Sequence, residues 1–166
     1  MIRLTFAGFL RTTVFLAVLA GPSSALRAGE AAAERTIVFV CLHGVVNSQM
    51  AAAYFNKVAK EKGLQFAAVS RGLDDRYRTV PVQIRDGLAL DGLQPANEPR
   101  QLTVDDAGRA SHVLAFDTVP PERAGQARVT YWAGVPIGID NYETTRDAIV
   151  RRVDALVEAI EKETSK

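Results

Sequence analysis

The chain has 166 residues, of which 20 are lysine or arginine, 19 are aspartate or glutamate, and 48% are apolar. This length corresponds to one ordinary domain, because soluble domains usually run about 100–200 residues. A net charge of +1 excludes a strongly basic nucleic-acid binder and a highly charged disordered chain. A single cysteine excludes an internal disulfide framework and a cysteine-based zinc cluster.

Residues 1–25 have the composition of a secretory signal peptide. They carry two arginines, no acidic residue and a compact apolar run at 14–20. The uncharged stretch at 12–26 is 15 residues long, which is short of the roughly 20 residues that cross a bilayer. We therefore predict cleavage after Ala25, with Ala28 as the second choice, and a periplasmic or secreted protein without a stable membrane span. An uncleaved N-terminal anchor is the alternative.

Removal of residues 1–25 changes the formal charge of the chain. Two arginines and no acid are lost, so 18 basic residues face 19 acidic ones and the net charge becomes −1. Residues 26–34, which are rich in alanine and glutamate, are expected to link the cleavage site to the fold. Residues 35–166 are expected to form one domain, since the sequence has no internal repeat.

Four short apolar runs predict β-strands, at residues 36–41, 65–70, 112–116 and 128–132. The first run is continuously apolar and rich in β-branched residues, which is typical of a central strand buried on both faces. Helical segments separate the strands, and this alternation predicts an α/β fold with a parallel sheet covered on both sides.

Four helical segments are predicted, at residues 49–62, 81–90, from 103 onward, and 144–163. Ser48 is expected to cap the first of them and Gly63 to end it. Pro81 should open the second helix, and Thr103 should cap the short third one. The last segment is strongly amphipathic, with an apolar face made of Ile149, Val153, Leu156, Val157 and Ile160.

Cys41 lies at the end of the first predicted strand, where parallel sheets bind ligands. The loop from Cys41 to Ser48 leads into a helix, whose free N–H groups and dipole form a site for anions. Gly44 lets this loop turn tightly, and the Ser48 hydroxyl could donate to a Cys41 thiolate. These features indicate a nucleophilic cysteine that attacks a phosphate-like substrate. A small buried apolar cysteine is the alternative that the residues leave open.

His43, within this loop, is interpreted as a hydrogen-bonding surface residue rather than a catalyst. His43 and His112 have no other candidate ligand nearby in the sequence, so we do not interpret them as a metal pair. The sequence predicts neither a metal nor a cofactor.

Residues 37–42 followed by 48–51 resemble the low-molecular-weight protein tyrosine phosphatases and the related thioredoxin-coupled arsenate reductases. Further similar stretches follow in the same order, at residues 69–72, 102–106, 115–117 and 142–146. The similarity extends over roughly residues 35–163. The resemblance implies a single domain with a four-stranded parallel sheet flanked by helices.

The resemblance also implies a phosphate-binding loop with Cys41 as the nucleophile that forms a phosphocysteine. The residues that would hold the phosphate are Leu42, His43, Gly44, Val45, Val46, Asn47 and Ser48. The hallmark of the family is a cysteine, five residues, and an arginine followed by serine or threonine. This chain keeps the cysteine and the serine at that separation but has Asn47 in place of the arginine.

Asn47 argues for weak turnover. Arginine is a charged fork that grips two phosphoryl oxygens, whereas asparagine is neutral and shorter. Loss of such an arginine costs roughly 10³–10⁵ in rate, while the backbone N–H groups would still bind an oxyanion. The sequence therefore predicts phosphate-monoester hydrolysis with low activity, and phosphotyrosine is one candidate substrate. A catalytically inactive pseudo-phosphatase that binds an oxyanion or a phosphorylated ligand is the alternative, and an interaction domain with a vestigial loop is a third.

The general acid of the family is an aspartate in a loop before the last helix. Its position matches Gly134 here, and Asp140 follows six residues later. Asp140 is the candidate acid, with a surface or capping role as the alternative. Arg71 is expected to be a surface charge, with a contribution of positive charge to the site as the alternative, and Asp117 is assigned a structural role.

Arsenate reduction is disfavoured, because the thioredoxin-coupled enzymes need further cysteines. The expected partner is a phosphorylated small molecule, a phosphoprotein or an inorganic oxyanion.

Overall fold

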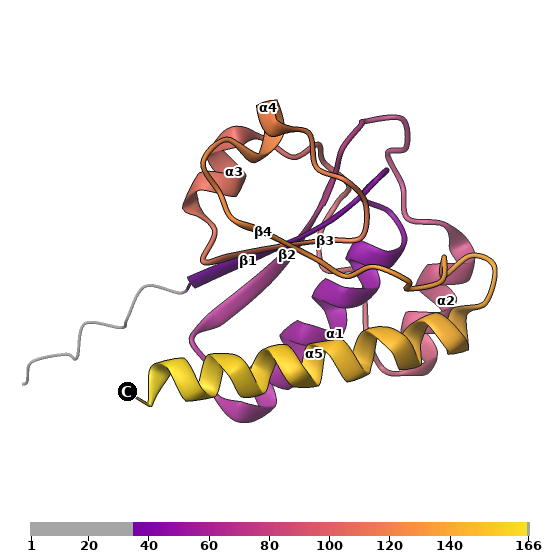
Figure 1. Ribbon diagram of the computed structural model, residues 1–166. Helices are drawn as coiled ribbons and strands as arrows, with labels where there is room; N and C mark the ends of the chain where they lie inside the picture. Colours follow the sequence, from indigo (N-terminus) through magenta and orange to yellow (C-terminus); the bar gives the residue numbers. More distant parts are fainter. Residues whose placement is uncertain (1–34, 166) are drawn as a thin grey trace, which may run out of the picture. The chain divides into compact units, whose positions relative to one another are not determined.

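The computed structural model describes residues 35–165, so the predicted signal peptide and the linker at 26–34 lie outside the described residues. Its centre is a four-stranded sheet in the order β2-β1-β3-β4, and every neighbouring pair of strands is parallel (Figure 1). The strands are β1 (Arg35–Cys41), β2 (Phe66–Gly72), β3 (His112–Ala115) and β4 (Val129–Tyr131). The predicted α/β fold and the central position of the first strand are confirmed.

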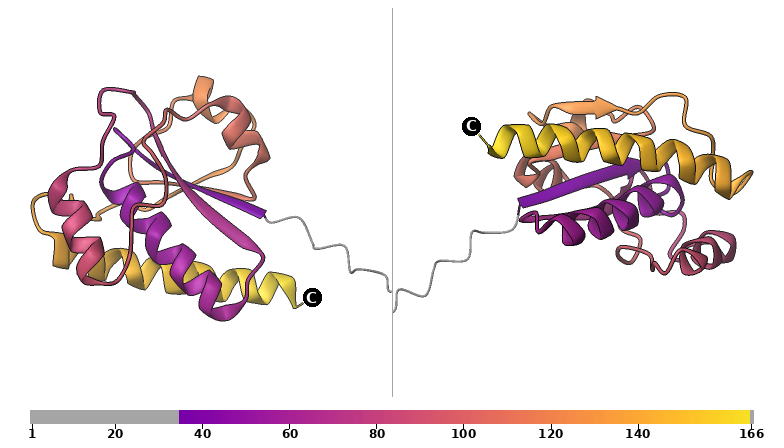
Figure 2. Two further views of the ribbon diagram at one scale, coloured as in Figure 1. Left: turned by 180° about the vertical axis from the view of Figure 1, so that it is seen from behind. Right: turned by 90° about the horizontal axis from the view of Figure 1, so that it is seen from below.

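The helices lie on both faces of the sheet, as Figures 1 and 2 show. They are α1 (Asn47–Lys62), α2 (Val82–Leu90), α3 (Val104–Arg109), α4 (Pro121–Ala124) and α5 (Tyr142–Thr164). Ile37 and Phe39 of β1 face a core built with α1, α2 and α5. Val38 and Val40 face a second, smaller core on the side of α3 and α4. The alternation of side chains along a strand explains how one continuously apolar run serves both cores.

The start of α1 differs from the prediction. The helix begins at Asn47, the residue before it is Val46, and no side chain caps it. Ser48 is not the cap because its hydroxyl is buried and is hydrogen-bonded to Cys41 and Ser70 instead. Thr103, in contrast, caps α3 as predicted, in a reciprocal capping box with Asp106.

Two further differences concern the second half of the chain. α5 begins at Tyr142, two residues earlier than predicted, because the Asn141 side chain accepts the Thr144 N–H and caps the helix there. The short α4 was not predicted, although it opens on Pro121, a residue favoured at the first helical position. Four residues are too few for a periodic apolar pattern to reveal a helix.

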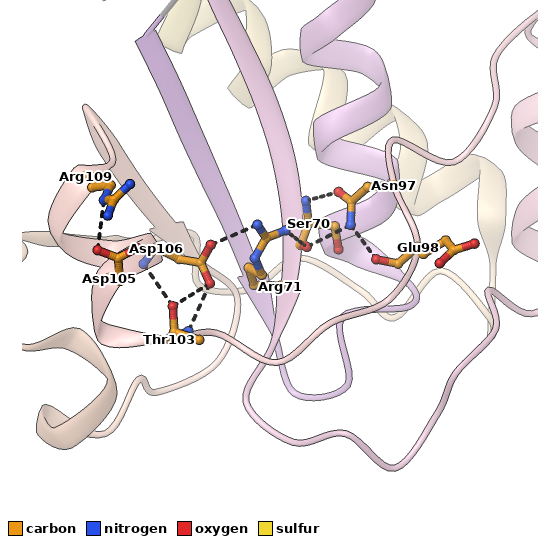
Figure 3. Close-up of polar contacts among 8 residues, drawn as sticks. All are labelled: Ser70, Arg71, Asn97, Glu98, Thr103, Asp105, Asp106 and Arg109. Carbon is orange, nitrogen blue, oxygen red and sulfur yellow. Dashed lines mark hydrogen bonds and ion pairs between the residues drawn. The ribbon is translucent and has the colours of Figure 1, made fainter.

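Arg71 is a correction to the sequence prediction, because it is buried and not a surface charge. Its guanidinium lies 2.9 Å from Oδ1 of Asp106 and also donates to the carbonyl of Ser70 (Figure 3). Burial would raise the pKa of Asp106, but hydrogen bonds from Arg71 and Thr103 outweigh it and hold the pKa at about 2. This ion pair ties β2 to α3.

Within residues 35–165, no helix has the length and apolar character needed to cross a membrane.

The Arg71–Asp106 pair predicts an acid-dependent loss of stability. Asp106 has a pKa of about 2 when folded and 3.8 as a free side chain, so the unfolded chain takes up the proton first. The stabilisation is complete above about pH 4 and is lost as the pH falls through about 2. When the pH is lowered from about 4 to about 2, the free energy of unfolding measured in urea should fall for both proteins. The fall should be about 2 kcal/mol larger for the wild type than for Asp106→Asn.

Asp105→Asn is the matched control, because Asp105 pairs with Arg109 on the exposed surface of α3. It should leave the acid dependence of the wild type unchanged. An Asp106→Asn variant as acid-sensitive as the wild type would contradict this account of the pair.

Candidate active site

A pocket of about 190 Å³ opens where β1 ends and α1 begins. It is lined by Cys41, Leu42, His43, Val45, Val46, Asn47, Asp117 and Ile137, and we call it the Cys41 pocket. Six of the predicted site residues therefore line one cavity. The other three predicted site residues, Gly44, Ser48 and Asp140, do not line it. Asp117 and Ile137 line the pocket although they were not predicted as site residues.

The Cys41 sulfur is linked to a chain of two hydroxyls. Its Sγ lies 2.9 Å from Oγ of Ser48, which lies 2.8 Å from Oγ of Ser70. The Ser70 hydroxyl in turn donates to the carbonyl of Gly44. Each hydroxyl has one proton to donate. When Cys41 is a thiol, it donates to Ser48, Ser48 donates to Ser70, and Ser70 donates to Gly44. When Cys41 is a thiolate, the direction of donation is reversed. In the reversed direction Ser48 donates to the sulfur, and the Gln49 amide still satisfies Gly44.

The backbone of the loop forms an array of N–H donors. The Leu42 N–H donates to Asp117, and the Met50 N–H donates to the carbonyl of Val46. Among the described residues, the N–H groups of residues 43–49 have no hydrogen-bond acceptor. They lie at the N-terminal end of α1, whose dipole adds positive potential. This arrangement is suited to binding an oxyanion above the Cys41 sulfur.

Gly44 is required by the path of this loop. Its φ is +67°, and a Cβ at this position would lie 2.6 Å from the backbone nitrogen of Gly72. A side chain at Gly44 would therefore collide with the end of β2, apart from the cost of its left-handed backbone. The tight turn predicted at Gly44 is confirmed.

Asn47 joins the loop to the segment before α5. Its Nδ2 donates to the carbonyl of Pro136 at 2.9 Å, and its Oδ1 accepts the N–H of Gly138 at 3.0 Å. The side chain is almost fully buried. Both ends of the Asn47 amide are therefore hydrogen-bonded to the backbone of another segment, although Asn47 also lines the Cys41 pocket.

His43 is held by a carboxylate at the edge of the Cys41 pocket. Its Nδ1 lies 2.8 Å from Oδ1 of Asp74, and its ring meets the ring of Tyr77 edge-on at 4.8 Å between centroids. The hydrogen bond with His43 lowers the pKa of Asp74, with a further contribution from the backbone N–H of Arg76. Asp74 is therefore a charged acceptor for this histidine.

Asp140 does not reach the Cys41 pocket. Its side chain is exposed, and its backbone N–H closes a turn with Ile137. The carboxylate that does line the pocket is Asp117, whose Oδ2 accepts the Leu42 N–H at 2.8 Å. Asp117 follows β3, which pairs with β1 in parallel, so both strands end at the same edge of the sheet. That rule, applied to the third predicted strand as well as the first, is the signal that finds Asp117.

Comparison with known families agrees with this geometry. Residues 36–131 match the model of the low molecular weight phosphotyrosine protein phosphatases. The match covers more than half of the chain and includes β1, the loop and β2. The chain belongs to this family of cysteine-based phosphatases.

Solved structures with the same fold include YfkJ from Bacillus subtilis, with 22% identity, a TM-score of 0.70, and coverage of 78% of this chain and 96% of that one. A mutant of the YwlE arginine phosphatase is also 22% identical, with a TM-score of 0.68 and coverage of 76% and 96%. A protein tyrosine phosphatase from Entamoeba histolytica is 16% identical, with a TM-score of 0.66 and coverage of 78% and 99%. No curated protein matches the chain significantly by sequence.

The two hydrogen bonds of Asn47 predict a structural role that can be measured. Asn47→Ala leaves the Gly138 N–H and the Pro136 carbonyl without their partner, so the free energy of unfolding should fall by about 2 kcal/mol. Hydrogen exchange should show lost protection of the Gly138 amide.

Asn56→Ala is the matched control, because Asn56 makes the same pair of backbone bonds at Ala68. It should lower the free energy of unfolding to a similar extent. The Gly138 amide should keep its protection from hydrogen exchange, apart from exchange through global unfolding. Unchanged Gly138 protection in Asn47→Ala would contradict the role given to Asn47.

Proposed function

We propose that this protein is a cysteine-dependent phosphate-monoester hydrolase that works through a phosphocysteine at Cys41 and turns over slowly. The observation that carries the proposal is the combination of Cys41 with the loop that leads into α1, in which seven consecutive N–H groups, of residues 43–49, have no acceptor among the described residues. Those N–H groups can donate hydrogen bonds to the three charged oxygens of a phosphoryl group during its transfer.

In the proposed reaction, the Cys41 thiolate attacks phosphorus in line with the leaving oxygen. Ser48 donates its hydroxyl to the thiolate before attack and to the sulfur again when the phosphocysteine is hydrolysed. A solved relative supports a covalent intermediate at this place: the YwlE arginine phosphatase mutant, with serine in place of cysteine, carries a phosphorylated active-site serine.

The proposed slowness follows from the charge of the Cys41 pocket. Among the residues that line it there is no lysine or arginine, and Asn47 is bonded to the backbone of Pro136 and Gly138. An arginine that stabilises phosphoryl transfer contributes about 10³–10⁵ in rate. The helix dipole and the backbone N–H groups remain, so we expect binding to persist and turnover to be reduced.

The second candidate function is a pseudo-phosphatase that binds an inorganic oxyanion, a phosphorylated small molecule or a phosphoprotein without turnover. The observation that favours it is the Asp117 carboxylate, which lines the Cys41 pocket and occupies the Leu42 N–H. A second negative charge there opposes a dianionic substrate more than it opposes a singly charged ligand.

Cys41→Ser separates the two candidates. The purified wild type should hydrolyse an aryl phosphate slowly, and Cys41→Ser should reduce that rate to background because the hydroxyl is a far weaker nucleophile. Binding of inorganic phosphate, measured by calorimetry, should survive the substitution. Wild-type activity equal to that of Cys41→Ser, with phosphate still bound, would overturn hydrolysis in favour of the pseudo-phosphatase.

Asn47→Arg is the companion variant in the same assay. If the loop has the geometry of an active phosphatase, a guanidinium at this position should raise kcat, by roughly 10³-fold at best, at the expense of the bonds to Pro136 and Gly138. Wild-type turnover as fast as that of ordinary aryl phosphatases would contradict the proposed slowness.

We also propose that the protein works outside the cytoplasm, on the strength of the composition of residues 1–25. The N-terminal residue of the protein recovered from the cell envelope tests this. Leu26 is expected, from cleavage after Ala25, and a protein that stays in the cytoplasm with residues 1–25 intact would overturn the proposal.

A further inference from the structure

The Cys41 pocket lacks the proton donor that its family places in the loop before the last helix. Asp140 is exposed and does not line the pocket, and Gly134 has no side chain. The titratable residues that do line it are Cys41, His43 and Asp117. Cys41 is the nucleophile of the proposed reaction, and Asp117 uses a carboxylate oxygen to accept the Leu42 N–H. Among the residues that line the pocket, His43 is therefore the remaining titratable group that could carry a proton.

The hydrogen bond between His43 and Asp74 decides which ring nitrogen is available. Asp74 is held in its charged form, because its Oδ1 accepts from His43 and from the backbone N–H of Arg76. A carboxylate can only accept, so Nδ1 of His43 must carry the proton of the 2.8 Å bond. This leaves Nε2, which has no hydrogen-bond partner among the described residues. A carboxylate that fixes one ring nitrogen and frees the other is the usual way to orient a catalytic imidazole.

The position of His43 within the Cys41 pocket suits a leaving group. Cys41 is only 7% exposed and is one of the residues that line the pocket. His43 lines the same pocket, its side chain is 27% exposed, and its ring lies beside Tyr77. In an in-line displacement the leaving oxygen lies opposite the attacking sulfur. His43 is more exposed than Cys41, so a substrate bound between Cys41 and solvent can receive a proton from His43.

We propose that His43 is the acid–base residue of this site, oriented by Asp74, and that it replaces the missing acid of the loop before α5. This inference rests on the proposed phosphatase function. When the Cys41 sulfur bonds to phosphorus and the bond to the leaving oxygen breaks, the proton on Nε2 passes to that oxygen. Water then bonds to phosphorus and gives a proton to Nε2, while the electrons of the S–P bond return to Cys41 as a thiolate. Phosphate is released and His43 is protonated again.

The groups around His43 are acidic or aromatic. Asp74 faces Nδ1, and Asp117 and Cys41 line the same pocket. Tyr77 presents an aromatic ring at its edge, and Arg76 contributes its backbone N–H to Asp74. No lysine or arginine side chain is among these groups.

The test compares two substrates that differ in their need for a proton. Phenyl phosphate has a leaving group that must be protonated, whereas 2,4-dinitrophenyl phosphate has one that leaves as a stable anion. His43→Asn in the purified protein should lower kcat by about 10²-fold or more for phenyl phosphate and only a few-fold for 2,4-dinitrophenyl phosphate. The KM for each substrate should change little, because His43 acts on the leaving oxygen in the transition state rather than in binding.

Two further variants separate positioning from structure. Asp74→Asn should keep part of the activity and lower the rate for phenyl phosphate more than the rate for 2,4-dinitrophenyl phosphate, because the neutral amide orients the His43 ring less firmly than the carboxylate does. His112→Asn changes the other histidine, at the start of β3 beside Phe66, and should leave the ratio of the two substrates unchanged. Binding of inorganic phosphate by His43→Asn shows that the folded site is intact.

The outcomes distinguish this inference from the proposed function. Equal losses for both substrates in a phosphate-binding His43→Asn variant, or no loss for either, would overturn the role of His43 while leaving the phosphatase in place. A wild type that hydrolyses neither substrate faster than Cys41→Ser would overturn the phosphatase itself and the role of His43 with it.

Discussion

The close approach of two glycines is the constraint on which the rest of the site depends. Cys41 and Gly72 are partners in the β1–β2 register, and the chain after each of them folds against the other. A Cβ on Gly44 would lie 2.6 Å from Gly72, and a Cβ on Gly72 would lie 2.8 Å from the backbone of His43. Because neither position carries a side chain, the loop can approach the end of β2 closely, and Ser70 reaches both Ser48 and Gly44.

No lysine or arginine is among the described residues that line the Cys41 pocket. Arg71, which follows Ser70 in β2, is buried and paired with Asp106 of α3 instead. Asn47, the residue before Ser48 in the loop, is hydrogen-bonded to the segment before α5. An anion in the Cys41 pocket would therefore be held by backbone N–H groups and the dipole of α1, which provide a weaker field than a guanidinium does.

Much of the fold was predictable because its signals are local. A continuously apolar strand, the Thr103 cap and the apolar face of α5 are properties of neighbouring residues, and each was confirmed. Predictions about side chains were less successful, since Ser48 does not cap its helix and Arg71 is not on the surface. Both residues are polar, and the hydrogen-bond partners of polar side chains come from distant parts of the chain that the local sequence pattern does not reveal.

The sequence by itself determined the order of the strands and of every helix except the short α4, the place of Cys41 at the end of a central strand and the absence of an arginine from its loop. Only the tertiary structure decided what the other site residues touch. Asp117 meets Leu42 across 75 positions, Asp74 meets His43 across 31, and Pro136 meets Asn47 across 89. Contacts of this range arise when parallel strands bring their carboxyl ends to one edge of the sheet, and that convergence turns scattered polar residues into a pocket.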